Sequence, residues 1–321
     1  MKALVIGINS YPGAPLHGCI NDAEEVAELL EKHDDGRPNF AVRKLIDPKT
    51  SREIWEEIEN LFKGDGNVSL LYFSGHGYID FIGGDIVTPD CYGSSYKMGI
   101  SMADIMQCAN KSKVKNKIIL LDCCHSGNMG KAPDGDGSTL APGVSILTAC
   151  KEDEPAMERG GHGVFTNLLC DALRGGAADF DGKISIGSIY AYIDKSLNIW
   201  LQRPIFKTNV SQFISLRSVT PKVPLSIIRR IKDYFPESTH VYGLDPSYEF
   251  TNRKDYKHEV TPPYTNFQNV EIFKDLQKLQ SIGLVEPCEE EHMYFAAMHS
   301  KSCRLTSLGK HYWKLAKESK I

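Results

Sequence analysis

The sequence predicts an α/β protein whose mostly parallel β-sheet is covered by helices on both faces and followed by a smaller second module. Over the first two-thirds of the 321 residues, short apolar runs alternate with amphipathic helical segments. That alternation is typical of a parallel sheet buried on both sides. It stops near Pro221 and Pro224, and we therefore expect one domain at residues 1–217 and another at 221–321.

Six strands and five helices are expected in the first domain. Four strands are short apolar runs bounded by polar residues, at residues 2–8, 68–73, 117–122 and 144–149, and two more are placed at 41–46 and 211–216. Apolar side chains at helical spacing predict helices at residues 21–32, 51–62, 101–109, 164–173 and 186–197. Asn21 or Asp22 is expected to cap the first helix and Ser51 the second. Gly175-Gly176 should end the fourth.

The second module is expected to be a small winged-helix-like α+β domain. An amphipathic helix at residues 271–282 precedes a short strand at 284–286. A β-hairpin is then expected from residues 293–298 and 303–305, and a closing helix at 307–316. This module carries 15 basic and 13 acidic side chains, and Glu289-Glu290-Glu291 lies beside the expected wing. Both features argue against a phosphate-binding surface, so nucleic acid is not the expected partner, although the module leaves that option open.

The composition argues against nucleic-acid-binding, membrane-spanning and disulfide-rich secreted proteins. The formal net charge of −4 gives no argument for nucleic-acid binding by the whole chain. No apolar run approaches the roughly 18 residues needed to span a bilayer. No charged leader with a long apolar stretch follows Met1. The nine cysteines are irregularly spaced and do not form a disulfide framework or a paired metal motif. We therefore expect a cytoplasmic protein without a membrane partner.

Residues suited to nucleophilic catalysis follow two of the expected strands. Ligands bind parallel sheets beyond the carboxyl ends of the strands. There, Ser74-Gly75-His76-Gly77 follows one strand and Asp122-Cys123-Cys124-His125-Ser126-Gly127 follows another. A neighbouring imidazole lowers the pKa of a thiol or takes its proton, and the amides of Gly77 and Cys124 are candidate donors to an oxyanion. The alternative is that His76 and Cys124 are ordinary loop and core residues.

Four sequence blocks resemble those of metacaspases, in the caspase-like peptidase superfamily. Two are the blocks around His76 and Cys124. The third is Leu16-His17-Gly18-Cys19-Ile20-Asn21-Asp22-Ala23, and the fourth is Thr148-Ala149-Cys150-Lys151-Glu152-Asp153 followed by Gly163-Val164-Phe165-Thr166. They occur in family order over residues 1–217. The resemblance implies a caspase-like fold and a cysteine endopeptidase with a His76–Cys124 dyad. The same resemblance implies that Cys123 and His125 have structural and not catalytic roles.

The resemblance also implies a specificity pocket formed by Cys19, Asp22, Ser74 and Asp122. Two carboxylates favour Arg or Lys in the substrate, because a carboxylate pairs with a guanidinium or an ammonium group. The expected partners are therefore proteins with exposed Arg or Lys sites. The alternatives are that Asp22 is a helix cap and Asp122 a buried hydrogen-bond acceptor. Residues 144–149 are expected to pair with the substrate backbone as an added strand.

Regulation by metal or ligand is less clearly indicated. Many metacaspases use calcium, and Asp80, Asp85 and Asp90 follow His76, but they lack the dense acidic pattern of a calcium site. No cofactor is expected to be required. Lys131, in the Gly-rich loop at residues 127–143, is a candidate site for activation cleavage. Aromatic and basic side chains mix at residues 245–260, where Arg253, Lys254 and Lys257 are candidates to bind a nucleotide-like ligand, or the segment is a solvated connector.

Three functions compete on this sequence. The first is an Arg/Lys-directed cysteine endopeptidase switched through its C-terminal module by a small ligand or protein, with bacterial defence or programmed cell death as a setting suggested by analogy. The second is a DNA-binding transcriptional regulator with an inactive caspase-like scaffold. The third is an enzyme that acts on arginine side chains or transfers acyl groups with the same nucleophile. Intact His76 and Cys124 and the four ordered blocks favour the first.

Overall fold

The chain folds into two compact units, Met1–Thr220 and Pro221–Ile321. This computed structural model describes residues 1–79, 84–91, 98–124, 131–132, 135–138, 140–149, 158–159, 161–197, 203–255 and 260–321, without the side chains of 131–132, 135–138 and 158–159. The predicted roles of Asp80, His125 and Lys257, the side chain of Lys131, and residues 127–130, 133–134 and 139 of the loop at 127–143 therefore lie outside the described residues.

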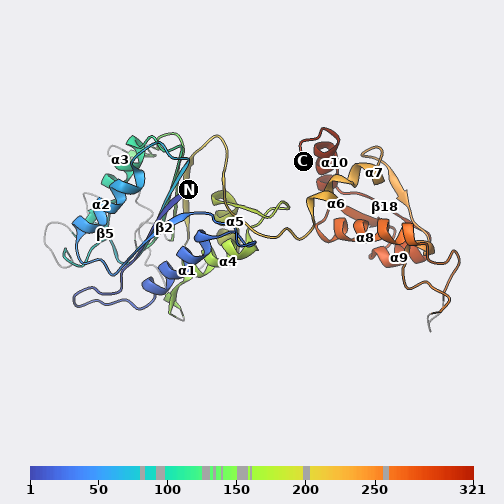
Figure 1. The fold of residues 1–321 in the computed structure, drawn as a ribbon, viewed down its shortest axis with the longest axis horizontal. Helices are drawn as coiled ribbons and strands as arrows, with labels where there is room; N and C mark the ends of the chain where they lie inside the picture. The colour runs from blue at the N-terminus through green and yellow to red at the C-terminus, as the bar shows by residue number, and fades with distance from the viewer. Residues whose placement is uncertain are drawn as a thin grey trace. The chain divides into compact units, whose positions relative to one another are not determined.

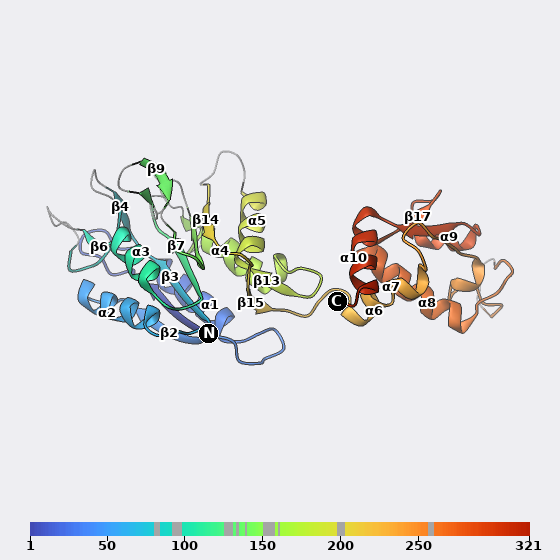
Figure 2. The ribbon, with the colours of Figure 1, turned by 90° about the horizontal axis from the view of Figure 1, so that it is seen from above.

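A six-stranded sheet forms the centre of the first unit, as the sequence predicts (Figures 1 and 2). Its strand order is β14-β10-β7-β3-β1-β2. All neighbouring strands are parallel except β14, which runs antiparallel to β10. The strands are β1 (Lys2–Gly7), β2 (Ala41–Ile46), β3 (Val68–Ser74), β7 (Asn116–Asp122), β10 (Val144–Thr148) and β14 (Ile205–Asn209).

The predicted sixth strand is wrong in position. The sheet ends on β14 at Ile205–Asn209, whereas β15 (Ser215–Ser218) pairs with β13 (Lys183–Ser185) in a separate two-stranded sheet. β14 is an edge strand with half-buried and exposed residues only. It therefore has no apolar run that would mark it in the sequence, while Ile214 and Leu216 gave a stronger but misplaced signal.

Helices cover both faces of the sheet because successive strand residues point to opposite sides. On one face, Ala3, Val5, Leu70 and Tyr72 pack with α1 (Cys19–Glu31), α4 (Val164–Asp171) and α5 (Ile186–Ser196). On the other face, the alternate residues of the same strands pack against α2 (Ser51–Phe62) and α3 (Met102–Lys111). Figures 1 and 2 show this two-sided arrangement.

Two predicted helix caps are wrong. Helix α1 begins at Cys19, so Asn21 and Asp22 lie within its first turn, and Asn9 accepts hydrogen bonds from the amides of Cys19 (3.0 Å) and Ile20 (3.4 Å) in place of a cap. Helix α2 is capped by Thr50, whose hydroxyl accepts from the amide of Glu53 at 3.2 Å. After α4, a π-helical turn η2 (Ala172–Gly176) closes at Gly175, whose φ of 128° suits glycine.

Short strands surround the carboxyl edge of the main sheet. One small sheet contains β4 (Gly77–Ile79), β5 (Gly84–Val87) and β6 (Gly99–Ser101). Two antiparallel pairs are β8 (Lys131–Ala132) with β9 (Gly135–Ser138), and β11 (Glu158–Arg159) with β12 (His162–Gly163). Among the described residues, no helix is long and apolar enough to cross a membrane.

The second unit combines helices with a three-stranded antiparallel sheet of order β16-β18-β17. Its elements are α6 (Leu225–Arg229), α7 (Ile231–Tyr234), β16 (Val241–Gly243), η3 (Pro246–Tyr248), α8 (Phe267–Ser281), β17 (Val285–Cys288), α9 (Met293–Met298), β18 (Ser302–Leu305) and α10 (Ser307–Lys317). The predicted hairpin strand at 293–298 is wrong, because this segment is helix α9. It buries Met293, Ala296 and Ala297, which is a helical spacing. β18 pairs instead with β17, and the winged-helix assignment stays a prediction.

Candidate active site

The two predicted catalytic residues follow neighbouring strands of the sheet. In the parallel pair β3–β7, Ser74 lies opposite Asp122. His76 and Cys124 each come two residues after that pair, so both leave the sheet at the same edge. Cys124 is partly exposed, whereas Cys123 is fully buried. Because a nucleophilic thiol must be accessible, this difference favours Cys124 over its neighbour.

The ring of His76 is held by the loop that follows β1. Its Nε2 donates a hydrogen bond to the carbonyl oxygen of Ala14 at 2.9 Å. Since a carbonyl only accepts, the proton lies on Nε2 and the lone pair of the neutral ring is on Nδ1. Tyr11 packs edge-on against the ring, with centroids 4.6 Å apart, and its hydroxyl accepts from the His76 amide at 3.1 Å. These contacts fix both the orientation and the tautomer of the imidazole.

Two glycines allow the chain to pass closely on either side of His76. A Cβ at Gly75 would lie 2.4 Å from the Tyr11 hydroxyl oxygen. A Cβ at Gly77 would lie 2.0 Å from the carbonyl oxygen of Cys124. The backbones of Gly77 and Cys124, which the sequence named as candidate oxyanion donors, are therefore in direct contact.

The predicted pocket residues meet where α1 begins. Cys19 is one turn before Asp22, and both are buried. The hydroxyl of Ser74, at the end of β3, donates to Asp22 Oδ2 at 3.3 Å. Gly163 links Asp22 to Asp122, because a Cβ there would lie 2.1 Å from Asp122 Oδ2 and 3.2 Å from Asp22 Oδ2. Two carboxylates thus approach one glycine within the buried edge of the sheet.

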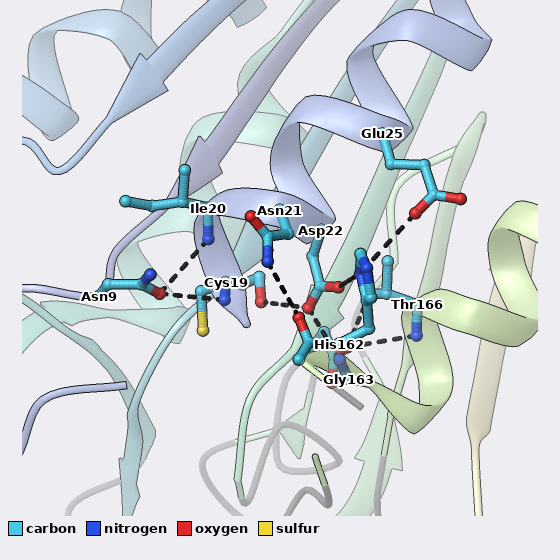
Figure 3. Close-up of polar contacts among 12 residues, drawn as sticks. Asn9, Cys19, Ile20, Asn21, Asp22, Glu25, His162, Gly163 and Thr166 are labelled. Carbon is cyan, nitrogen blue, oxygen red and sulfur yellow. Dashed lines mark hydrogen bonds and ion pairs between the residues drawn. The ribbon is translucent and has the colours of Figure 1, made fainter. Parts of the chain in front are cut away.

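Both carboxylates also bind residues at the start of α4 or just before it, and Figure 3 shows the contacts of Asp22. Asp22 accepts from His162 Nδ1 at 2.9 Å and from the amide of Gly163 at 3.0 Å. Asp122 Oδ2 accepts from the hydroxyl of Thr166 at 2.7 Å and from its amide at 3.3 Å. Burial raises the pKa of Asp22, and the donors from Gly163, His162 and Ser74 oppose that rise. Asp122 is thus a buried acceptor, the alternative considered for it, and Asp22 is not a cap.

The sequence did not point to His162, Thr166, Tyr11 or Ala14. Gly163 and Thr166 belong to the fourth sequence block, but their contacts with the carboxylates depend on how α4 packs beside β7. Tyr11 and Ala14 lie in a loop without a motif. A signal was available for Tyr11, a large aromatic residue shortly after a strand end, and none for the Ala14 carbonyl.

The structure also bears on the predicted substrate-pairing strand and on the acidic residues considered for calcium. The predicted substrate-pairing strand at residues 144–149 is wrong, because β10 is hydrogen-bonded to β7 on one edge and to β14 on the other. Asp90 accepts from the amide and hydroxyl of Ser51 at the start of α2. Asp85 accepts from the amide of Met98. Within the described parts of the chain, no group of three acidic, His or Cys side chains is placed to hold a metal ion.

Two of the three candidate ligand residues of the second unit, Arg253 and Lys254, already have partners within the chain, and Lys257 lies outside the described residues. Arg253 forms a two-point ion pair with Asp255, with nitrogen–oxygen distances of 2.9 and 2.6 Å. Lys254 lies over the ring of Tyr264, with its Nζ 4.4 Å from the centroid. An anion would therefore have to compete with Asp255 for Arg253.

Comparison with known proteins finds one family and solved structures with a similar fold. The family model of the caspase domain matches residues 1–222 of this chain. The crystal structure of protein GSU0716 from Geobacter sulfurreducens matches with a TM-score of 0.50 and 19% identity, over 68% of this chain and 99% of that one. Caspase-1 from Spodoptera frugiperda matches with a TM-score of 0.50 and 13% identity, over 68% and 90%. Identities this low indicate a shared fold alone. No curated protein matches the chain.

Proposed function

This chain belongs to the caspase-domain family, a family of cysteine peptidases, and we propose that it cleaves peptide bonds after Arg or Lys with Cys124 as nucleophile and His76 as base. The observation that carries the proposal is the placement of these two residues, each two positions beyond the paired ends of β3 and β7. The tautomer of His76 supports it, because the lone pair on Nδ1 can accept the thiol proton.

The proposed reaction has two steps. His76 Nδ1 takes the proton of Cys124, and the thiolate sulfur attacks the substrate carbonyl carbon. The amides of Gly77 and Cys124 would donate to the oxyanion. When the C–N bond breaks, the imidazolium gives its proton to the leaving amine, and a thioester remains. Water, deprotonated by His76, then hydrolyses the thioester and restores the thiol.

The proposed preference for Arg and Lys depends on Asp22 and Asp122, with Cys19 and Ser74 beside them. The close approach of both carboxylates to Gly163 supports a pocket with negative charge. Described donors use three acceptor positions of Asp22, and a carboxylate offers about four. A substrate guanidinium or ammonium would thus find one acceptor position on Asp22, and the negative charge of Asp122 beside it would favour the same cation.

The proposal includes control by the second unit, Pro221–Ile321. A separate compact unit after a peptidase domain supports a sensor role, with a nucleotide-like molecule or a protein as activator. We place the protein in the cytoplasm, and bacterial defence or programmed cell death is its proposed setting by analogy. No cofactor is required by the proposed chemistry.

Substitution of His76 and of the adjacent cysteines Cys123 and Cys124 tests the proposed dyad. Cys124→Ala and His76→Ala should each reduce cleavage of an Arg-containing fluorogenic peptide by at least about a thousandfold, because the reaction loses its nucleophile or base. Cys123→Ala, a buried neighbour, is the matched control and should keep most of the activity. Thermal unfolding should show that all three variants are folded. Cleavage by Cys124→Ala at the wild-type rate would exclude the proposed mechanism.

A further inference from the structure

The segment that ends in His162-Gly163 lies against the first turn of α1. The side-chain amide of Asn21 donates to the Gly161 carbonyl at 3.2 Å. Gly18 lies so close to this segment that a Cβ would be 3.1 Å from the same oxygen. His162 and Gly163 then donate to the two oxygens of Asp22, Oδ1 and Oδ2 respectively, as Figure 3 shows. Asp22 is therefore held from both sides of its carboxylate.

His162 differs from the other donors to Asp22 in that it can carry charge. The Ser74 hydroxyl and the Gly163 amide are neutral donors. The side chain of Asp22 is 1% exposed, whereas that of His162 is 29% exposed and can exchange a proton with solvent. A buried carboxylate beside a second carboxylate loses its charge unless donors or a cation stabilise it. The imidazole supplies that stabilisation on the outer side of Asp22.

We propose that His162 is a positioning residue that determines specificity: its Nδ1–H keeps Asp22 oriented and ionised for the basic side chain of the substrate. The inference rests on the proposed function, since it concerns the same pocket. His162 acts through Asp22 and is not itself in contact with the reacting atoms. Without it, Asp22 would keep only neutral donors and would hold a guanidinium less well.

Other ionisable groups surround this pair and set its pH dependence. Glu25, on α1, lies 3.7 Å from His162 Nδ1 and also pairs with Arg174 of η2. Within the described parts of the chain, the other ionisable groups close to Asp22 are Asp122 of β7, Tyr72 of β3 and Cys170 of α4. Burial raises the pKa of Tyr72 and Cys170, so both stay neutral near pH 7. Tyr72 and Cys170 therefore add no charge beside Asp22 at that pH.

Binding of agmatine, a guanidinium compound without a peptide bond, tests the pocket independently of the reaction. The protein is full-length Cys124→Ala, and the matched pair is His162→Asn and His162→Leu. These side chains have similar shapes, but only Asn offers a donor near the position of Nδ1. We expect His162→Leu to bind agmatine about tenfold more weakly at pH 7, the size of a lost hydrogen bond to a charged group. His162→Asn should stay within about threefold of the parent.

The pH dependence separates positioning from simple packing. Asn cannot become a cation, so Asp22 in His162→Asn should take up its proton at a higher pH than in the parent protein. Agmatine affinity should therefore fall at a higher pH in His162→Asn. This measurement decides the question even where His162→Leu does not fold.

Three results would overturn the inference: equal affinity in the matched pair, an unshifted pH dependence in His162→Asn, or no agmatine binding by the parent. Peptide cleavage by the protein with Cys124 intact reports on the proposed function separately. Cleavage after Arg that is indifferent to His162 would refute only the inference. Absence of Cys124-dependent cleavage would refute the proposed function, while the binding data would still decide the role of His162.

Discussion

The carboxylates of Asp22 and Asp122 have two functions in this account. Both accept hydrogen bonds from residues at the start of α4 or just before it, and both line the pocket proposed for the substrate's basic side chain. Gly163 permits this because it has no side chain between them. Its φ of −64° is open to any residue, so the requirement at this position is space and not backbone conformation.

Gly163→Ala should therefore damage both stability and specificity. The new methyl group would overlap Asp122 Oδ2, and we expect the free energy of unfolding to fall by about 1–3 kcal/mol, as for other overpacked sites. Cleavage after Arg should fall as the carboxylates move apart. Gly66→Ala is the matched control, because a Cβ there meets nothing within 4 Å. Chemical denaturation and peptide assays of both variants check this, and equal behaviour would contradict the geometry described for Gly163.

At the scale of secondary-structure elements, the position of α1 decides where Asp22 lies. The helix has no cap from Gly18, and Asn9 at the end of β1 accepts from its first amides. A Cβ at Gly7 would lie 2.4 Å from the carbonyl oxygen of Cys19, so the helix begins directly against the strand end. One asparagine thus links the sheet to the helix that carries Asp22.

Asn9→Ala should lower the free energy of unfolding by about 1 kcal/mol, the usual cost of losing a cap. It should also raise KM for Arg substrates more than it lowers kcat, since α1 carries the pocket and not the dyad. Asn9→Asp keeps the acceptor and serves as the control. If Asn9→Ala matches Asn9→Asp in thermal unfolding, the capping role is wrong.

The sequence predicted the elements with strong apolar patterns and failed where the pattern was weak. Four of the five parallel strands were found because they are buried on both faces, whereas β14 is a half-exposed edge and was missed. The fifth, β2, is also a half-exposed edge but was predicted correctly. Helix α9 was mistaken for a strand because all six of its residues are apolar or aromatic, so the short segment shows no helical period. His76 and Cys124 were proposed as a catalytic pair because they follow buried strands in sequence blocks that resemble those of metacaspases. His162 was not, because it follows no strand of the main sheet and meets Asp22 only through tertiary packing.

At the scale of the whole molecule, the chain separates into two units, and the first unit can be produced alone by ending the chain at Thr220. Val219 donates to the Gly182 carbonyl, and Thr220 donates through its amide and hydroxyl to Asp34. A chain ending at Thr220 keeps these contacts of the first unit. The second unit has its own core, which includes Ile228, Phe235 and Leu276.

If Pro221–Ile321 restrains the peptidase, a chain of residues 1–220 should be more active than the full chain. We expect the two activities to differ by about 5-fold to 150-fold, which corresponds to the typical coupling free energy between two sites. Adding a cell extract or nucleotides should raise the activity of the full chain and leave the truncated chain unchanged. Equal high activity of both proteins, unaffected by any addition, would show that the second unit is not a switch.

Cleavage of three matched fluorogenic peptides, with Arg, Lys or Asp before the scissile bond, tests the central claim most directly. The enzymes are the wild-type chain, Cys124→Ala and Asp122→Ala, each assayed with and without residues 221–321. We expect the wild type to cleave after Arg and Lys and to leave the Asp peptide uncut, and Cys124→Ala to cleave none of the three. In Asp122→Ala, the activation free energy for cleavage after Arg should rise by roughly 2–5 kcal/mol, the cost of breaking a buried charge pair. Efficient cleavage after Asp, or cleavage after Arg that survives Cys124→Ala, would contradict these expectations.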